Sequence, residues 1–106
     1  MLNKIGILIL TLTLSFSAYA ADGMINVASN HSVKETADRL QNILKSKGMK
    51  IFGRVPHSEG AKSVGIELQP MELIIFGNPK VGSPLMKCAK SVAIDLPQKA
   101  LIWQAK

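Results

Sequence analysis

The sequence predicts an α+β fold: a two-layer α/β sandwich with a small mixed sheet, in the order strand, helix, strand, short helix, strand, helix, strand. Three observations predict it. Apolar residues recur at helical spacing after Ser32, an almost continuous apolar run occupies residues 71–76, and glycines and prolines separate the segments. The connections are short and allow both parallel and antiparallel pairing.

The first twenty residues have the pattern of a secretory leader. Lys4 gives a positive start, an apolar stretch follows over residues 5–14, and Ala18-Tyr19-Ala20 matches the small-x-small pattern that signal peptidase accepts. The apolar stretch is shorter than the roughly 20 residues of a membrane anchor, so an integral membrane protein is not expected. We expect cleavage after Ala20, which leaves residues 21–106 as a single domain in the periplasm or outside the cell.

Charge and cysteine content narrow the kinds of partner. The whole chain carries a formal charge of +6, and loss of Lys4 with the leader leaves +5. The basic residues are dispersed, which is typical of a solvated surface and also suits an anionic partner such as a membrane surface. An exported protein is not expected to bind nucleic acid. Cys88 is the only cysteine, so the core must hold by packing, by a partner subunit, or by both.

The first expected elements are a short strand over Met24 to Ala28 and a helix that starts after Ser32. Ser32 and Glu35 form a capping box, in which the serine side chain accepts from the Glu35 amide. The apolar side chains that follow recur at helical spacing. Gly48 ends this helix, because glycine adopts the left-handed conformation at little cost.

Two strands and a short helical segment come next. Residues 49–55 alternate as a strand, which Pro56 ends, and residues 57–64 are small and polar and are expected to form a loop with one helical turn. The apolar run over 71–76 suits a strand covered on both faces. Residues 77–79, Gly-Asn-Pro, break that strand.

The last elements are a helix and a strand. Ser83 suits an N-cap and Pro84 suits the first helical position, where its missing N–H costs nothing, so a helix is expected over Pro84 to Ser91. Residues 95–97 then turn the chain, and residues 99–104 close it as a strand.

These segments together resemble the family called domain of unknown function 302, from about Ser32 to Trp103. The matching motifs are Lys47-Gly48, Arg54-Val55 ahead of His57, Ala61, Gly65-Ile66-Glu67-Leu68 with Pro70, Glu72-Leu73 with Phe76-Gly77-Asn78-Pro79, Gly82-Ser83-Pro84-Leu85-Met86 and Asp95-Leu96-Pro97. The resemblance implies a small α+β domain and a homodimer. It offers no established substrate or catalytic residue.

The chain departs from the family pattern at two places. Members usually carry aspartate before the histidine, whereas this chain has Pro56 before His57, which weakens any acid/base role for the imidazole. Members also tend to continue into another strand, whereas this sequence stops at Lys106 and resembles a shortened member. The strand over 99–104 is therefore expected to have an open edge, which is a site for pairing with a partner or a folding liability.

The candidate ligand-binding residues follow strand ends. His57 follows the strand over 49–55, and its imidazole can act as a base or bind a metal, although no second histidine lies at ligand spacing. The turn after the strand over 71–76 leads into a helix N-terminus, whose amides with a nearby lysine can hold an anion; a rigid turn is the simpler interpretation. The full candidate set is His57, Gly77, Asn78, Lys80, Gly82 and Ser83.

The predicted function is a non-catalytic ligand-binding or interaction module that forms a homodimer. Its expected site is a cleft between the His57 loop and the 77–83 turn, for a small anionic or apolar ligand. The alternative is a small periplasmic enzyme, or a redox or metal accessory protein, that uses His57 or Cys88. A third hypothesis is a degenerate copy that does not fold. No catalytic residue or metal site is predicted, and a cofactor cannot be named.

Overall fold

The computed structural model describes residues 23–106. The predicted leader lies outside these residues. The elements in chain order are α2 (Val33–Ser46), β1 (Lys50–Val55), α3 (His57–Ser63), β2 (Met71–Gly77), α4 (Pro79–Cys88), the 3-10 helix η1 (Lys90–Ile94) and β3 (Gln98–Trp103).

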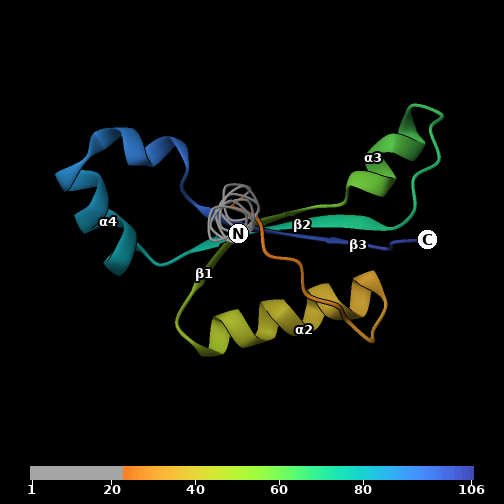
Figure 1. Cartoon of the computed structure of the whole chain (residues 1–106), viewed down its shortest axis with the longest axis horizontal. Coiled ribbons are helices and arrows are strands. Elements are labelled where there is room, and N and C mark those ends of the chain that lie inside the picture. Colours follow the sequence, from red (N-terminus) through yellow and green to blue (C-terminus); the bar gives the residue numbers. More distant parts are fainter. Residues whose placement is uncertain (1–22) are drawn as a thin grey trace, which may run out of the picture.

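The three strands form one sheet in the order β1-β2-β3, and both pairs are antiparallel. The α+β class is confirmed, but the expectation of a mixed sheet is wrong. Parallel pairing needs a connection that crosses the sheet. Here α3 and α4 lie at opposite ends of the sheet, and each following strand returns beside the one before it (Figure 1).

The predicted first strand over 24–28 is absent. This segment has no strand partner within the described residues, and the side chains of Ile25 and Val27 are 91% and 85% exposed. Its apolar pattern is compatible with a strand, yet a strand forms only where its backbone groups pair with a neighbour.

Helix α2 forms as its sequence predicts. The Ser32 hydroxyl accepts a hydrogen bond from the Glu35 amide at 3.1 Å. At the other end, Gly48 has a φ of 80°, the left-handed conformation that lets the chain leave the helix and enter β1 directly.

The core lies between α2 and one face of the sheet. Ala37 and Leu44 of α2 pack with Ile74 of β2, and these are the buried hydrophobic residues of the described chain. Around them lie the partly buried side chains of Leu40, Met49, Ile51, Phe76 and Ile102. Helix α2 is the helix that packs on this face of the sheet (Figure 1).

Helix α3 forms where a loop with one helical turn was predicted over residues 57–64, and it is longer than that single turn, spanning His57–Ser63. The amides of Glu59 and Gly60 both donate to the Pro56 carbonyl at 3.1 Å, so the proline that ends β1 also starts this helix. The Ser58 hydroxyl accepts from the Met71 amide at 3.2 Å, which ties α3 to the beginning of β2.

Helix α4 starts at Pro79, five residues before the predicted start at Pro84. Asn78 is the N-cap: its side chain accepts from the Lys80 amide at 3.1 Å, and Pro79 takes the first helical position. The Ser83-Pro84 pair that predicted the start lies inside the helix. Asn-Pro and Ser-Pro offer the same chemistry, and the first pair along the chain forms the cap.

Candidate functional site

The structure separates His57 from the other candidate residues. Lys50 at the start of β1 pairs with Gly77, whereas Val55 at its end pairs with Leu73. His57 therefore follows one end of the sheet, and the 77–83 turn leaves the other end. The expected cleft between them is wrong, because antiparallel pairing places the two strand ends on opposite sides of the domain (Figure 1).

The turn itself lines a cavity of about 240 Å³, called the turn cavity below. Four candidate residues take part, and Lys80 is not among the lining residues. The lining consists of Phe52, Gly77, Asn78, Pro79, Gly82, Ser83, Met86, Ala93, Leu96 and Pro97. Sequence reasoning missed the contributions of β1 and of the segment before β3, because they depend on long-range pairing.

Two glycines keep the turn cavity open. A Cβ atom at Gly77 would lie 3.4 Å from Cε2 of Phe52 and 3.6 Å from Cβ of Pro97. A Cβ atom at Gly82 would lie 3.6 Å from Cδ1 of Leu96. A larger side chain at either position would therefore enter the space between β1, α4 and the segment that leads into β3.

The amides at the start of α4 are already satisfied. The Lys80 amide donates to the Asn78 side chain at 3.1 Å, and the amides of Val81 and Gly82 both donate to the Asn78 carbonyl at 2.9 Å. Pro79 has no N–H to offer. The anion site predicted at this helix N-terminus would depend on free amides, and Asn78 and Pro79 leave none there.

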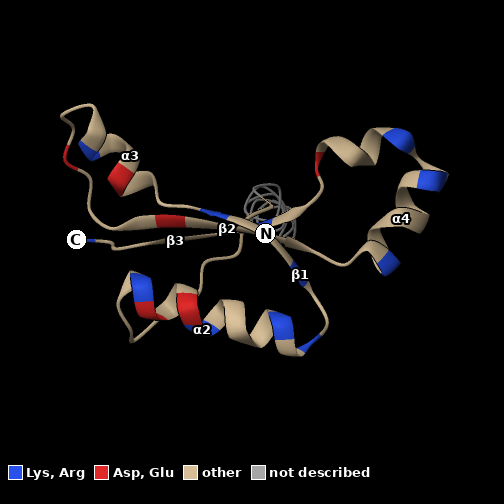
Figure 2. Cartoon of the chain, turned by 180° about the vertical axis from the view of Figure 1, so that it is seen from behind, with Lys and Arg blue, Asp and Glu red and all other residues tan. Residues whose placement is uncertain are grey.

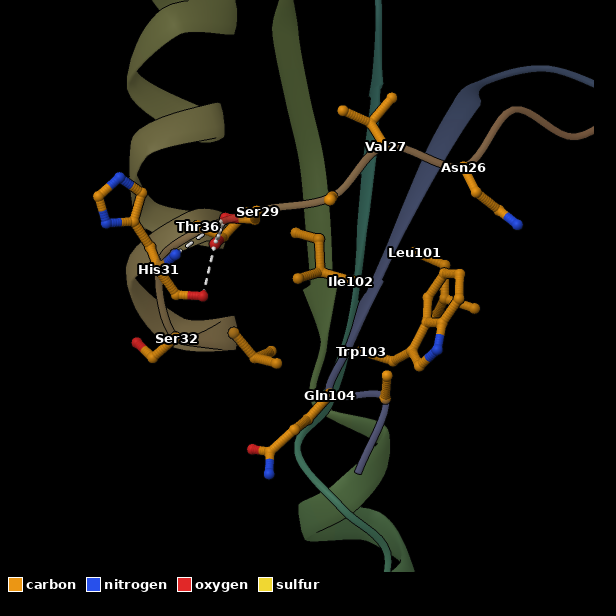
Figure 3. Close-up of a pocket in the computed structure, with 13 residues that line it drawn as sticks. Asn26, Val27, Ser29, His31, Ser32, Thr36, Leu101, Ile102, Trp103 and Gln104 are labelled. Atoms are coloured by element: carbon orange, nitrogen blue, oxygen red, sulfur yellow. Dashed lines mark hydrogen bonds between the residues drawn. The ribbon is translucent and has the colours of Figure 1, made fainter.

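A larger cavity, of about 720 Å³, runs along β3 (Figure 3). One wall is the exposed segment before α2 with the first turn of α2, and the other is residues 101–105. Ile102 points toward α2, whereas Leu101 and Trp103 point the other way. In the described chain β3 pairs only with β2. Among the described residues no strand lies at its other edge, which is the edge predicted to be open, and this cavity lies beside it.

The sheet face opposite α2 is apolar and has no helix packed over its middle. Because Ile74 faces α2, its neighbours along β2 and the residues that pair with them point the other way. These residues form what we call the uncovered face: Val55, Met71, Leu73, Ile75, Leu101 and Trp103, together with Lys99, which pairs with Ile75. Leu101 and Trp103 are 41% and 43% exposed. The expectation that the strand over 71–76 is covered on both faces is therefore wrong.

The charges of the domain are segregated (Figure 2). The end at α3 carries two acidic residues, Glu59 and Glu67, and one basic residue, Lys62. The end at α4 and η1 carries a single acidic residue, Asp95, among several lysines. Those lysines are Lys50, Lys80, Lys87, Lys90 and Lys99.

His57 and Cys88 are both exposed and lie apart. His57 is the first residue of α3, and Cys88 is the last residue of α4. Within residues 23–106, no group of three or more His, Cys, Asp and Glu side chains lies close enough to hold a metal ion.

A polar network ties α2 to the sheet. The Arg54 guanidinium on β1 bonds to Glu72 on β2 through Nε, and its Nη1 lies 2.7 Å from Oδ1 of Asp38 on α2. Glu72 and then Asp38 raise the pKa of Arg54, which stays charged. A hydrogen bond from Lys34, and next the bond from Arg54, hold the pKa of Asp38 below its ordinary value.

The lowered pKa of Asp38 predicts acid sensitivity. A carboxyl with a depressed pKa in the folded state stabilises the fold above its unfolded pKa, and this contribution is lost as the pH falls through the folded pKa. We expect the free energy of unfolding to decrease as the pH drops below 3.8, the ordinary value for aspartate. Urea titrations across acid pH measure it. Asp38→Asn should flatten the dependence; equal slopes in the variant and the wild-type protein would contradict the assignment.

Comparison with known proteins identifies the family. The family model "Domain of unknown function DUF302" matches residues 25–106. The chain is 49% identical over 82 residues to proteins named fluoride-specific ion channel FluC 1 from Brucella suis biovar 1 (strain 1330) and Brucella abortus biovar 1 (strain 9-941). The match covers 77% of this chain but 32% and 30% of those proteins, so the chain spans about a third of their length.

A solved structure has the same fold. It is the crystal structure of an uncharacterised conserved DUF302 protein from Bacillus stearothermophilus, with a TM-score of 0.70 and 23% identity, over 76% of this chain and 63% of that chain. In residues 23–106, none of the helices has the length and apolar character needed to cross a membrane. The family model, the long matched segment and the shared fold agree: the chain belongs to the DUF302 family, whose members share a domain of unknown function.

Proposed function

We propose that this domain is a non-catalytic interaction module that forms a homodimer through its uncovered face. The observation that carries the proposal is the composition of that face. An antiparallel sheet with one face in water usually presents polar side chains there. This sheet presents Leu101 and Trp103, each more than two fifths exposed, beside Leu73 and Ile75.

The core of the single copy is small, so packing against a partner would add stability. The described chain buries three hydrophobic residues, Ala37, Leu44 and Ile74, on the α2 side of the sheet. Covering the other face would remove further apolar surface from water, at roughly 25 cal/mol for each Å². Exposed aromatic residues such as Trp103 are also the side chains that most often dominate protein interfaces.

The charge distribution favours a second copy as the partner. In a two-fold dimer each surface meets the same surface of the other copy. If two sheets pack face to face in opposite directions, the basic α4 end of one copy lies over the acidic α3 end of the other. Lys87 and Lys90 would then approach the region of Glu59 and Glu67, an arrangement that opposite charges stabilise and orient.

The longer relatives support a modular role. The matched 82 residues make up 32% and 30% of the two fluoride-channel proteins, so the same segment occurs as one part of larger chains. For this chain, we place the mature domain in the periplasm or outside the cell after cleavage following Ala20, on the strength of the leader pattern alone.

The test is a pair of substitutions on the uncovered face. Leu101→Glu and Trp103→Glu are each expected to weaken self-association roughly tenfold or more, because they place a charge in an apolar contact. Sedimentation of the processed protein over a range of concentrations measures the dissociation constant.

The matched control is Ile43→Glu, on the exposed side of α2, where the side chain is 51% exposed. It should leave the dimer intact. Circular dichroism confirms that each variant is folded. A wild-type protein that stays monomeric at every concentration, or a control that dissociates the dimer equally, would refute the proposal.

A further inference from the structure

We propose that the turn cavity binds a small amphiphilic anion: an apolar body of the medium-chain carboxylate class, with its charged group at the rim. This goes beyond the proposed homodimer, since the cavity lies between the 77–83 turn and the segment before β3, and neither Leu101 nor Trp103 lines it. Three features of the cavity carry the inference.

The first feature is the apolar lining. Phe52, Met86 and Leu96 contribute side chains from three separate segments, and none of the lining residues is charged. The turn cavity has a volume of about 240 Å³ and is open to solvent on one side. Its polar side chains are Asn78 and Ser83, and the Asn78 oxygen already accepts from the Lys80 amide. Water would find few partners inside, so an apolar body is favoured.

The second feature is a pair of ammonium groups, each beside a residue that lines the cavity. Nζ of Lys50 lies 5.4 Å from the centre of the Phe52 ring, and Nζ of Lys99 donates to the Pro97 carbonyl at 3.2 Å. Phe52 and Pro97 both line the cavity. Two positive charges thus lie next to residues that line an apolar space, an arrangement that complements an anionic head group on an apolar tail.

The third feature is that neither lysine is neutralised nearby. Among the described ion pairs, none involves Lys50 or Lys99, and Asp95, the acidic residue closest along the chain, pairs with neither. The amides at the start of α4 are satisfied by Asn78. A head group is therefore recognised by the lysines and not by the helix N-terminus, and a small ion without an apolar body gains little.

The test uses three probes on the processed protein with isothermal titration calorimetry. Octanoate has both the tail and the charge, octanol has the tail alone, and inorganic phosphate has the charge alone. We expect octanoate to bind about tenfold or more tightly than octanol, and phosphate to give no signal. Octanoate that does not bind, or phosphate that binds as well as octanoate, would overturn the proposal.

Two kinds of variant locate the site. Gly82→Leu should place a side chain against Leu96 and Met86 and abolish octanoate binding. Gly60→Leu, the same change in α3 with open space around it, should retain binding. The double variant Lys50→Gln/Lys99→Gln should reduce octanoate affinity to that of octanol, and Lys45→Gln, at an exposed position of α2, should not.

The variants also keep the two proposals distinguishable. The lysine substitutions test the site without filling it, should Gly82→Leu fail to fold. Octanoate binding that is unchanged in either variant would refute this site. Sedimentation of the same samples reports the oligomeric state separately, so loss of the dimer with octanoate binding intact would count against the homodimer alone.

Discussion

Ile74→Ala is expected to remove a large part of the stability of the fold and to lower its melting temperature strongly. Ile74 is fully buried at the centre of the sheet, and the only other buried hydrophobic residues of the described chain, Ala37 and Leu44, pack against it. Truncating a buried isoleucine to alanine costs about 2–5 kcal/mol. A domain has about 5–15 kcal/mol in total, and one of this size lies toward the lower end.

Thermal unfolding followed by circular dichroism measures this effect. Ile94→Ala is the matched control, because Ile94 is 84% exposed and its truncation should change stability by about 0.5 kcal/mol or less. All proteins should be compared at one concentration, since a dimer unfolds at a temperature that depends on concentration. If Ile74→Ala melted within a few degrees of wild type, the core would lie elsewhere.

Local signals in the sequence were sufficient to predict α2. Its start depends on Ser32 and Glu35, three residues apart, and its end depends on Gly48. All the information for these caps lies within one turn of helix, so no distant residue is needed to interpret it. The strands over 50–55, 71–77 and 98–103 were also predicted within one residue at each end.

The start of α4 shows where a local signal becomes ambiguous. Asn78-Pro79 and Ser83-Pro84 are both good helix starts, and the sequence prediction chose the second. A proline inside a helix usually removes one backbone bond. Here Pro84 is exposed, so water can solvate the carbonyl it leaves free, and the helix can begin at the earlier pair.

The candidate site depended on strand pairing, which the sequence pattern does not specify. Parallel pairing of the first two sheet strands would have placed His57 and the 77–83 turn at the same end of the sheet. Antiparallel pairing, with Lys50 opposite Gly77, places them at opposite ends of the sheet. The turn cavity has the same origin, because Phe52, Leu96 and Pro97 reach it only through the sheet. The apolar pattern over residues 24–28 likewise does not specify whether this segment pairs with an edge strand of the sheet.

Arg54→Met is expected to cost about 2 kcal/mol, less than the roughly 3–5 kcal/mol for breaking a fully buried ion pair. Arg54 bonds to Glu72 on β2 and to Asp38 on α2. The Glu72 side chain is 14% exposed, so without Arg54 its carboxylate would stay largely out of water with no cation beside it. The Asp38 side chain is 43% exposed and can be solvated, which reduces the expected loss.

A double-mutant cycle separates the ion pair from the packing of the arginine stem. The cycle uses Arg54→Met, Glu72→Leu and the double variant, with free energies of unfolding from urea titrations. Replacing both partners should restore much of the stability that Arg54→Met loses, because no unpaired charge then remains near the core. Additive losses would show that the two side chains act independently.

The control cycle uses Arg39 and Glu35, an exposed pair within α2 at 3.0 Å. Its coupling should be about 0.2–1 kcal/mol, as for other exposed pairs, and smaller than that of Arg54 with Glu72. The comparison has a structural consequence. Arg54 and Ile74 are paired neighbours on the face that α2 covers, so the polar network and the apolar core hold the same helix. A coupling that matched the control would show that Arg54 and Glu72 stabilise the sheet no more than an exposed pair stabilises α2.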